Sequence, residues 1–182
     1  MGKKYETLDS KEVWNGHIFR VRVDQVRMPA GHIAEREVIS HAGAVGIVPV
    51  TARSEVILVR QYRHAIEDYL LEIPAGKLDR VETPLECAFR ELKEEAGADA
   101  TELVELAQFY NSPGYSSELF HLYGALVANI GEVQPDGEEE QDMERVIIPL
   151  SEALEMTTGG EINDAKTVIG LFLADRWVQN QS

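Results

Sequence analysis

Three carboxylates fall within two turns of a predicted helix. Glu91, Glu94 and Glu95 are three and four residues apart, so they share one face of that helix. Like charges at this spacing repel one another and do not stabilise a helix. Hard divalent cations such as Mg²⁺ are usually held by a few carboxylates together with substrate phosphates. The cluster therefore indicates either a metal site or a solvated acidic face.

The residues around the cluster predict where its helix begins and ends. Pro84 suits a first helical turn, and Gly97 suits the C-terminal cap. The apolar positions recur at steps of three and four and predict one buried face: Leu85, Ala88, Leu92 and Ala96. Arg90 lies four residues before Glu94, where it can orient that carboxylate. Gly76, upstream of the helix, would let the backbone turn and expose a carbonyl.

The spacing of these residues resembles the Nudix box. The pattern runs from Gly76 to Glu82, then to Arg90-Glu91-Leu92, and ends with Glu94-Glu95 and Gly97. Only Ala98 departs from it, because the family usually has a larger aliphatic residue there. The resemblance implies a hydrolase that cleaves a nucleoside diphosphate linked to another moiety. It also implies that the box holds a divalent metal ion.

The resemblance assigns roles within the box. The expected metal ligands are the Ala75 carbonyl and the carboxylates of Glu91, Glu94 and Glu95, although Glu94 could instead orient a ligand. The catalytic candidates are Glu82, Arg90, Glu94 and Glu139. Mg²⁺ is the expected cofactor, and Mn²⁺ is a possible substitute.

A second motif resembles the ADP-ribose pyrophosphatase branch of the family. It consists of Ser112-Pro113-Gly114 followed by Glu118, with Pro113 fifteen residues beyond Ala98. Without the box, the same residues would predict only an ordinary turn between two strands. The resemblance implies that Ser112 and Glu118 bind substrate.

Two arginines complete the expected substrate site. Arg63 follows a predicted strand and can bind a phosphate through its bidentate fork. In the resembling branch an arginine at the place of Arg36 reaches the nucleotide site of the partner subunit. A surface position is the alternative for each. The implied assembly is a homodimer.

An acidic loop over residues 131–142 offers candidates for the general base. Glu138, Glu139 and Glu140 are adjacent, and neighbouring like charges raise carboxylate pKa values. The resemblance points to Glu139, with an error of one residue either way. The alternative is that the loop is only solvated and that Glu82 or Glu94 is the base.

Composition limits the class of protein. The 182 residues fit one domain, or one domain with a small appendage, and the formal net charge is −15. This charge argues against nucleic acid and against an anionic membrane surface as partners. No apolar run reaches transmembrane length and the N-terminus has no signal-peptide core, so a cytoplasmic location is expected. Cys87 stands alone and is expected to be a buried, inert thiol.

The hydropathy pattern predicts an α/β (α+β) fold. Residues 5–28 alternate apolar and polar about an Asn15-Gly16 turn, which predicts antiparallel N-terminal strands. Later strands alternate with three helices, and Ser151 is the expected N-cap of the second. The third helix is expected to bury five residues: Val168, Leu171, Phe172, Ala174 and Trp177. The resemblance implies a Nudix-type α/β/α sandwich with a mixed sheet. The expected division is an N-terminal strand unit, 1–42, and a hydrolase domain, 43–182.

The resemblance to ADP-ribose pyrophosphatases implies one reaction. ADP-ribose and water would give AMP and ribose 5-phosphate with the help of Mg²⁺. Hydrolysis of another nucleoside diphosphate sugar, such as GDP-mannose, is the alternative within the class. A non-catalytic ADP-ribose sensor of the same fold is the alternative from another class.

Overall fold

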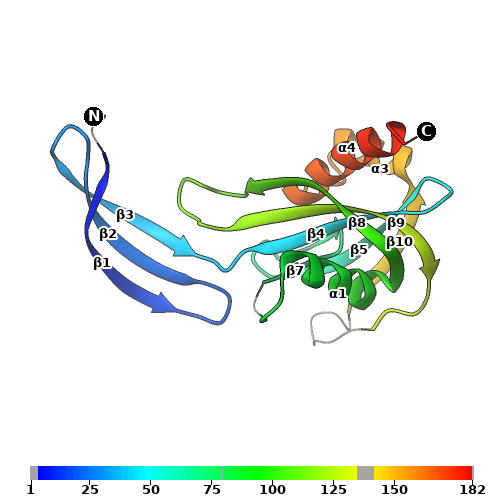
Figure 1. The fold of residues 1–182 in the computed structure, drawn as a ribbon, viewed down its shortest axis with the longest axis horizontal. Coiled ribbons are helices and arrows are strands. Elements are labelled where there is room, and N and C mark those ends of the chain that lie inside the picture. Colours follow the sequence, from blue (N-terminus) through cyan, green and yellow to red (C-terminus); the bar gives the residue numbers. More distant parts are fainter. Residues whose placement is uncertain (1–3, 79, 135–141, 182) are drawn as a thin grey trace. The chain divides into compact units, whose positions relative to one another are not determined.

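The structure is a computed structural model that describes residues 4–78, 80–134 and 142–181 (Figure 1). Its chain forms two compact units. One contains Met1–Gly43 with Tyr110–Leu119, and the other contains Ala44–Phe109 with Phe120–Ser182. The first unit thus includes Tyr110–Leu119, a segment that the prediction had placed in the hydrolase domain, 43–182. The boundary itself stays a prediction.

The first unit is built on a three-stranded antiparallel sheet. Its strands follow the chain order and are β1 (Glu6–Asn15), β2 (Arg20–Arg27) and β3 (Ile33–Ser40). At the predicted turn, the N–H of Gly16 donates to the Phe19 carbonyl at 3.1 Å. The 110–119 segment is tied to β3, because the N–H of Ile39 donates to the Tyr115 carbonyl at 2.7 Å. The predicted antiparallel N-terminal strands are confirmed.

The second unit contains a mixed seven-stranded sheet of order β10-β5-β4-β9-β8, with β6 on β5 and β7 on β4. β4 and β9 run parallel, and β4 runs antiparallel to β5 and β7. The strands are β4 (Ala44–Val50), β5 (Glu55–Arg63), β6 (Asp68–Glu72), β7 (Ala75–Lys77), β8 (Ala98–Tyr110), β9 (Leu119–Ile130) and β10 (Glu144–Pro149).

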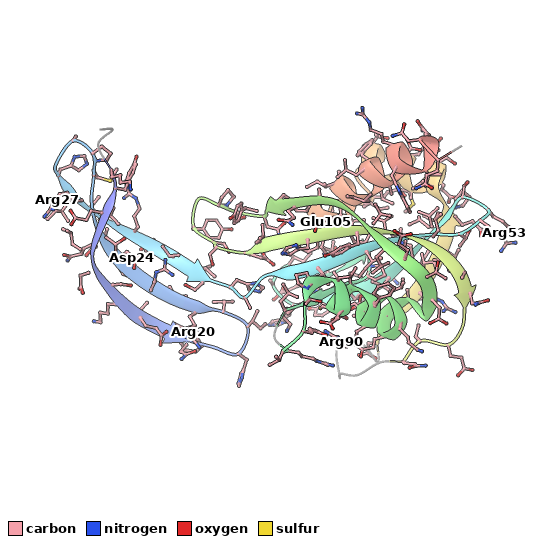
Figure 2. All side chains as sticks on the ribbon, viewed as in Figure 1. Arg20, Asp24, Arg27, Arg53, Arg90 and Glu105 are labelled. Carbon is pink, nitrogen blue, oxygen red and sulfur yellow. The ribbon has the colours of Figure 1, made fainter. Side chains whose placement is uncertain are left out.

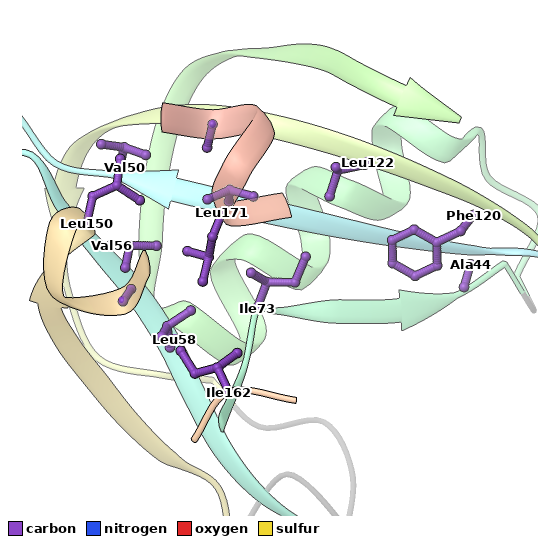
Figure 3. Packing of buried hydrophobic residues seen from close by; sticks show 13 residues of the cluster. Ala44, Val50, Val56, Leu58, Ile73, Phe120, Leu122, Leu150, Ile162 and Leu171 are labelled. Atoms are coloured by element: carbon purple, nitrogen blue, oxygen red, sulfur yellow. The ribbon is translucent and has the colours of Figure 1, made fainter. Parts of the chain in front are cut away.

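Helices cover both faces of this sheet. They are α1 (Pro84–Ala96), α3 (Leu150–Gly159) and α4 (Ala165–Gln179). Successive residues of a strand point to opposite faces, so Ile47 packs with Leu92 of α1 while Val48 packs with Leu171 of α4. Figure 3 shows the cluster under α3 and α4. The predicted α/β/α sandwich is therefore confirmed.

Three local predictions are wrong. α3 begins after Pro149 without a side-chain cap, so Ser151 is not its N-cap. Leu85 and Phe172 are 43% and 49% exposed, although both were expected in the core.

α4 is apolar on much of its circumference, so periodicity does not identify its buried face. Gly170 defines that face, because a Cβ there would lie 3.0 Å from Cγ2 of Val48.

No helix in the described part of the chain is long and apolar enough to cross a membrane.

Candidate active site around helix α1

The sequence fixes both ends of α1 by local interactions. The N–H of Glu86 donates to the Thr83 hydroxyl at 3.3 Å, and the Thr83 N–H donates to Oε2 of Glu86 at 2.7 Å. This reciprocal pair is a capping box, and Pro84 occupies the first helical position between its two residues. Gly97 ends the helix with a φ of 58°. These ends set which residues face β7.

Glu91 and Glu95 project from α1 onto the backbone of β7. Both residues are buried. Oε2 of Glu95 accepts the N–H of Ala75 at 2.8 Å. Glu91 lies over Gly76, where a Cβ would be 1.7 Å from Oε1 of Glu91. Because buried carboxylates need hydrogen bonds or cations as partners, this part of the sheet is suited to binding positive charge.

Arg90, which is labelled on α1 in Figure 2, forms hydrogen bonds with three carboxylates of the box. Its Nη1 donates to Oε1 of Glu91 and to Oε2 of Glu94, each at 2.7 Å. Its Nη2 and Nε donate to the two oxygens of Glu82 at 2.6 and 3.2 Å. These bonds, mainly those with Glu82, raise the pKa of Arg90 and lower the pKa of Glu82.

The donor set fits a hard divalent cation. The four carboxylates Glu82, Glu91, Glu94 and Glu95 outnumber the arginines that act on them, Arg90 and Arg80, so the group keeps a net negative charge. Within the described ranges, no three His, Cys, Asp or Glu side chains already converge with metal-ligand geometry. Arg90 contacts three of these carboxylates, and the Ala75 N–H contacts the fourth, that of Glu95. The Ala75 carbonyl as a ligand stays a prediction.

Arg63 lies in the same unit and belongs to a second charged cluster. Its Nε and Nη2 donate to Oε1 and Oε2 of Glu72 at 2.7 and 2.6 Å. Lys166 also donates to Oε2 of Glu72. The hydrogen bonds that Arg63 donates to Glu72 raise the pKa of Arg63, and the negative charge of Glu95 adds to this effect. The two clusters therefore influence each other electrostatically.

Sequence reasoning missed Glu72 and Lys166. A signal for Glu72 was present, because it interrupts the otherwise apolar run from Tyr69 to Ile73. A charged residue in such a run is rarely buried unless it is paired. No comparable signal marks Lys166.

The remaining substrate-binding candidates lie in the first unit. Arg36 is exposed, and its Nη1 donates to the Glu35 carbonyl at 2.7 Å. Oε2 of Glu118 accepts from Nδ2 of Asn111 at 3.0 Å. The Ser112 carbonyl accepts the N–H of Ser116 at 2.8 Å and closes a turn. These residues and the box thus belong to different compact units.

The three general-base candidates, Glu138, Glu139 and Glu140, lie outside the described residues. The structure describes Glu82 and Glu94, the alternative bases, and both are bound to Arg90. The assignment of the base to Glu139 therefore stays a prediction.

The chain matches two domain families. The NUDIX domain matches residues 40–168, and the nucleoside diphosphate sugar hydrolase N-terminal domain matches residues 5–39. Since the first of these covers most of the chain, the protein belongs to the Nudix family.

Similar proteins cover most or nearly all of the chain. A methanol dehydrogenase activator of Bacillus methanolicus is 35% identical, over 94% of each chain. An ADP-ribose pyrophosphatase of Bacillus subtilis is 34% identical, over 91% of this chain and 90% of its own. A GDP-mannose pyrophosphatase of Salmonella arizonae is 36% identical, over 74% of each chain. The crystal structure of an ADP compounds hydrolase superposes with a TM-score of 0.83 at 28% identity, over 98% of this chain and 96% of its own.

Proposed function

We propose that this protein hydrolyses the diphosphate of ADP-ribose to AMP and ribose 5-phosphate, with Mg²⁺ as cofactor and Mn²⁺ as a possible substitute. One observation carries the proposal. Glu91 and Glu95 converge on the backbone of residues 75 and 76, and the charge of Glu95 acts on the nearby Arg63. A carboxylate cluster next to an arginine suits a ligand that brings both metal and phosphate. ADP-ribose pyrophosphatase names occur among the relatives that cover most of the chain.

Each group of the site has a distinct role in this proposal. Glu91, Glu94, Glu95 and the Ala75 carbonyl would hold the metal ion. A bound divalent ion neutralises diphosphate charge and lowers the pKa of an attacking water. Arg90 holds Glu91 and Glu94 in place from one side while Glu82 holds Arg90 from the other.

The proposal also keeps the residues that the sequence assigns to substrate binding and to the general base. Arg63 would contact the diphosphate oxygens. Ser112 and Glu118 stay substrate-binding residues predicted by the sequence. Glu139 would take the proton from the attacking water. A cytoplasmic location stays a prediction of the sequence.

A homodimer is part of the proposal. Every residue of β1 is exposed, including Trp14 at 60%. Apolar side chains exposed on a small sheet are typical of a surface that packs against a partner. Arg36 on β3 would then reach the nucleotide site of the other subunit. Sedimentation at micromolar concentration should give a dimer, and a fully active monomer would exclude this arrangement.

The alternatives differ in what they do to a nucleotide sugar. The GDP-mannose pyrophosphatase relative supports GDP-mannose as the rival substrate. A sensor of the same fold would bind ADP-ribose without cleaving it. The presence of every box carboxylate favours an enzyme over a sensor.

A panel of nucleoside diphosphate sugars with Mg²⁺ separates these possibilities. We expect kcat/KM for ADP-ribose to exceed that for GDP-mannose by roughly tenfold or more, with AMP as a product. Preferential cleavage of GDP-mannose would replace the substrate in the proposal. Tight binding of ADP-ribose without any product would favour the sensor.

A further inference from the structure

The carboxylate of Glu72 is a buried charge at the end of β6. Its side chain is 0% exposed, and it accepts hydrogen bonds from both Arg63 and Lys166. A buried carboxylate is costly unless cations or hydrogen bonds compensate it. Glu72 therefore requires its two cationic partners to stay in place.

Lys166 is held from two sides. It contacts Glu72 on β6, and its Nζ lies 3.0 Å from Oδ2 of Asp164, the N-cap of α4. The Thr167 hydroxyl donates to the same Asp164 oxygen at 2.6 Å and accepts the N–H of Ile73 at 2.9 Å. The first turn of α4 is thus bonded directly to the short segment between β6 and β7. The position of Lys166 is fixed by backbone elements and not only by its own rotamer.

Arg63, Lys166 and Glu72, together with Asp164, form one charged network. The side chains of this network become less exposed from Arg63 to Glu72. The side chain of Arg63 is 38% exposed, that of Lys166 is 13% exposed, and Glu72 is fully buried. Glu72 binds Nε and Nη2 of Arg63, and no hydrogen bond within the described residues engages Nη1. A guanidinium held along one edge presents the other edge in a fixed orientation, which suits a phosphate oxygen.

The network is also balanced in charge. Arg63 and Lys166 oppose Glu72 and Asp164. Without Lys166, Arg63 alone would neutralise the buried Glu72, and the cluster would become net negative beside the region where an anionic diphosphate is expected.

We propose that Glu72 and Lys166 are positioning residues that orient Arg63 toward the diphosphate of the substrate. Neither residue touches the substrate, and both act through the guanidinium of Arg63. This inference rests on the proposed function for its substrate, but the orientation of Arg63 is a property of the free protein. Two kinds of measurement therefore test it separately.

The first measurement needs no substrate. The Nε–H of Arg63 should give a slowly exchanging signal in ¹⁵N NMR, because it donates to a buried carboxylate; Arg63→Lys identifies the signal by removing it. In Lys166→Met the exchange should be roughly tenfold faster or more. Lys93→Met is the matched control, because Lys93 forms an exposed helix-end pair with Asp99. Unchanged exchange in Lys166→Met would contradict the proposal.

The second measurement distinguishes orientation from charge. Glu72→Gln removes a negative charge, so a purely electrostatic role predicts a lower KM for ADP-ribose. Orientation predicts the reverse, a KM that is roughly tenfold higher. Lys166→Met should also raise KM while the Mg²⁺ dependence stays as in wild type, and Lys166→Arg should recover part of the loss. A KM at or below the wild-type value in Glu72→Gln would overturn the proposal.

A charge-balanced variant covers the case in which a single substitution prevents folding. Glu72→Gln with Lys166→Met removes one charge of each sign, and such paired replacements are tolerated better than single ones. Its KM should match that of Glu72→Gln, and a wild-type KM would contradict positioning. If wild type cleaves another nucleotide sugar, the proposed function fails in wild type itself. The same variants are then assayed with that substrate, and the NMR comparison is unaffected.

Discussion

Gly76 of β7 and Glu91 of α1 share a space that admits only one side chain. A Cβ on residue 76 would lie 1.7 Å from Oε1 of Glu91 and 2.6 Å from its Cγ. Gly76 is not among the glycines with positive φ, so the backbone there does not require glycine for its conformation. The residue is needed because it leaves room for a carboxylate.

Gly76→Ala should therefore affect activity more than stability. The atom that the new methyl group meets is the end of a flexible side chain, so Glu91 moves and the fold remains. We expect kcat/KM to fall by roughly a hundredfold, because small displacements in a site are costly. The control is Gly159→Ala, whose Cβ would have an ordinary contact at 3.5 Å. Equal activity of the two variants would show that the position of Glu91 is unimportant.

Glu82 should make stability depend on pH. Its hydrogen bonds with Arg90 lower its pKa below the ordinary value of 4.5, against a smaller opposing effect of burial. The unfolded state then binds more protons in the window below that value. The stability that the ionised Glu82 contributes is therefore present above about pH 4.5. It is lost as the pH falls through the lowered pKa of Glu82.

Melting temperatures of wild type and Glu82→Gln test this sign. The wild-type Tm should exceed that of the variant near neutral pH, and the gap should narrow as the pH is lowered below about 4.5. Glu102→Gln, an exposed substitution on β8, should show no such change. A gap that stays constant with pH would mean that the Glu82–Arg90 contact does not titrate in this range.

Much of the fold was predictable because its signals are local. The Asn15-Gly16 turn, the Pro84 start and the Gly97 end of α1 each depend on a few neighbouring residues, and all three are observed. Phe172 was misplaced because α4 is apolar on several sides, and the buried face is chosen by the close approach of Gly170 to β4.

The site was only partly predictable for the same reason. Spacing on one helix identified Glu91, Glu94 and Glu95, since helical periodicity relates them directly. Glu72 and Lys166 are 94 residues apart in sequence and meet only through the packing of α4 on the sheet. No local pattern contains that contact.

Cys87 should be unreactive in the folded protein. Burial, with the nearby Glu82 and Glu91, raises its pKa to about 12. At pH 8 only about one thiol in ten thousand would then be ionised. A chromogenic disulfide reagent should react with it only after unfolding in guanidinium. Rapid stoichiometric reaction under native conditions would contradict this.

Glu139→Gln should separate catalysis from binding. Removing a general base costs roughly 10²–10⁴ in rate, while Mg²⁺ and substrate should still bind. Glu138→Gln and Glu140→Gln are the matched controls and should lose far less. If all three variants keep nearly the wild-type kcat at neutral pH, the base lies in the box.

A Mg²⁺ titration of ADP-ribose hydrolysis in Glu95→Gln tests the central claim most directly. Glutamine keeps an oxygen for the Ala75 N–H, which Glu95 accepts at 2.8 Å, so the helix should stay in place on β7. The account predicts that the variant needs a Mg²⁺ concentration at least roughly tenfold higher than wild type and is also less active. Glu102→Gln should behave as wild type. Full activity of Glu95→Gln at low Mg²⁺ would contradict a metal site at the box.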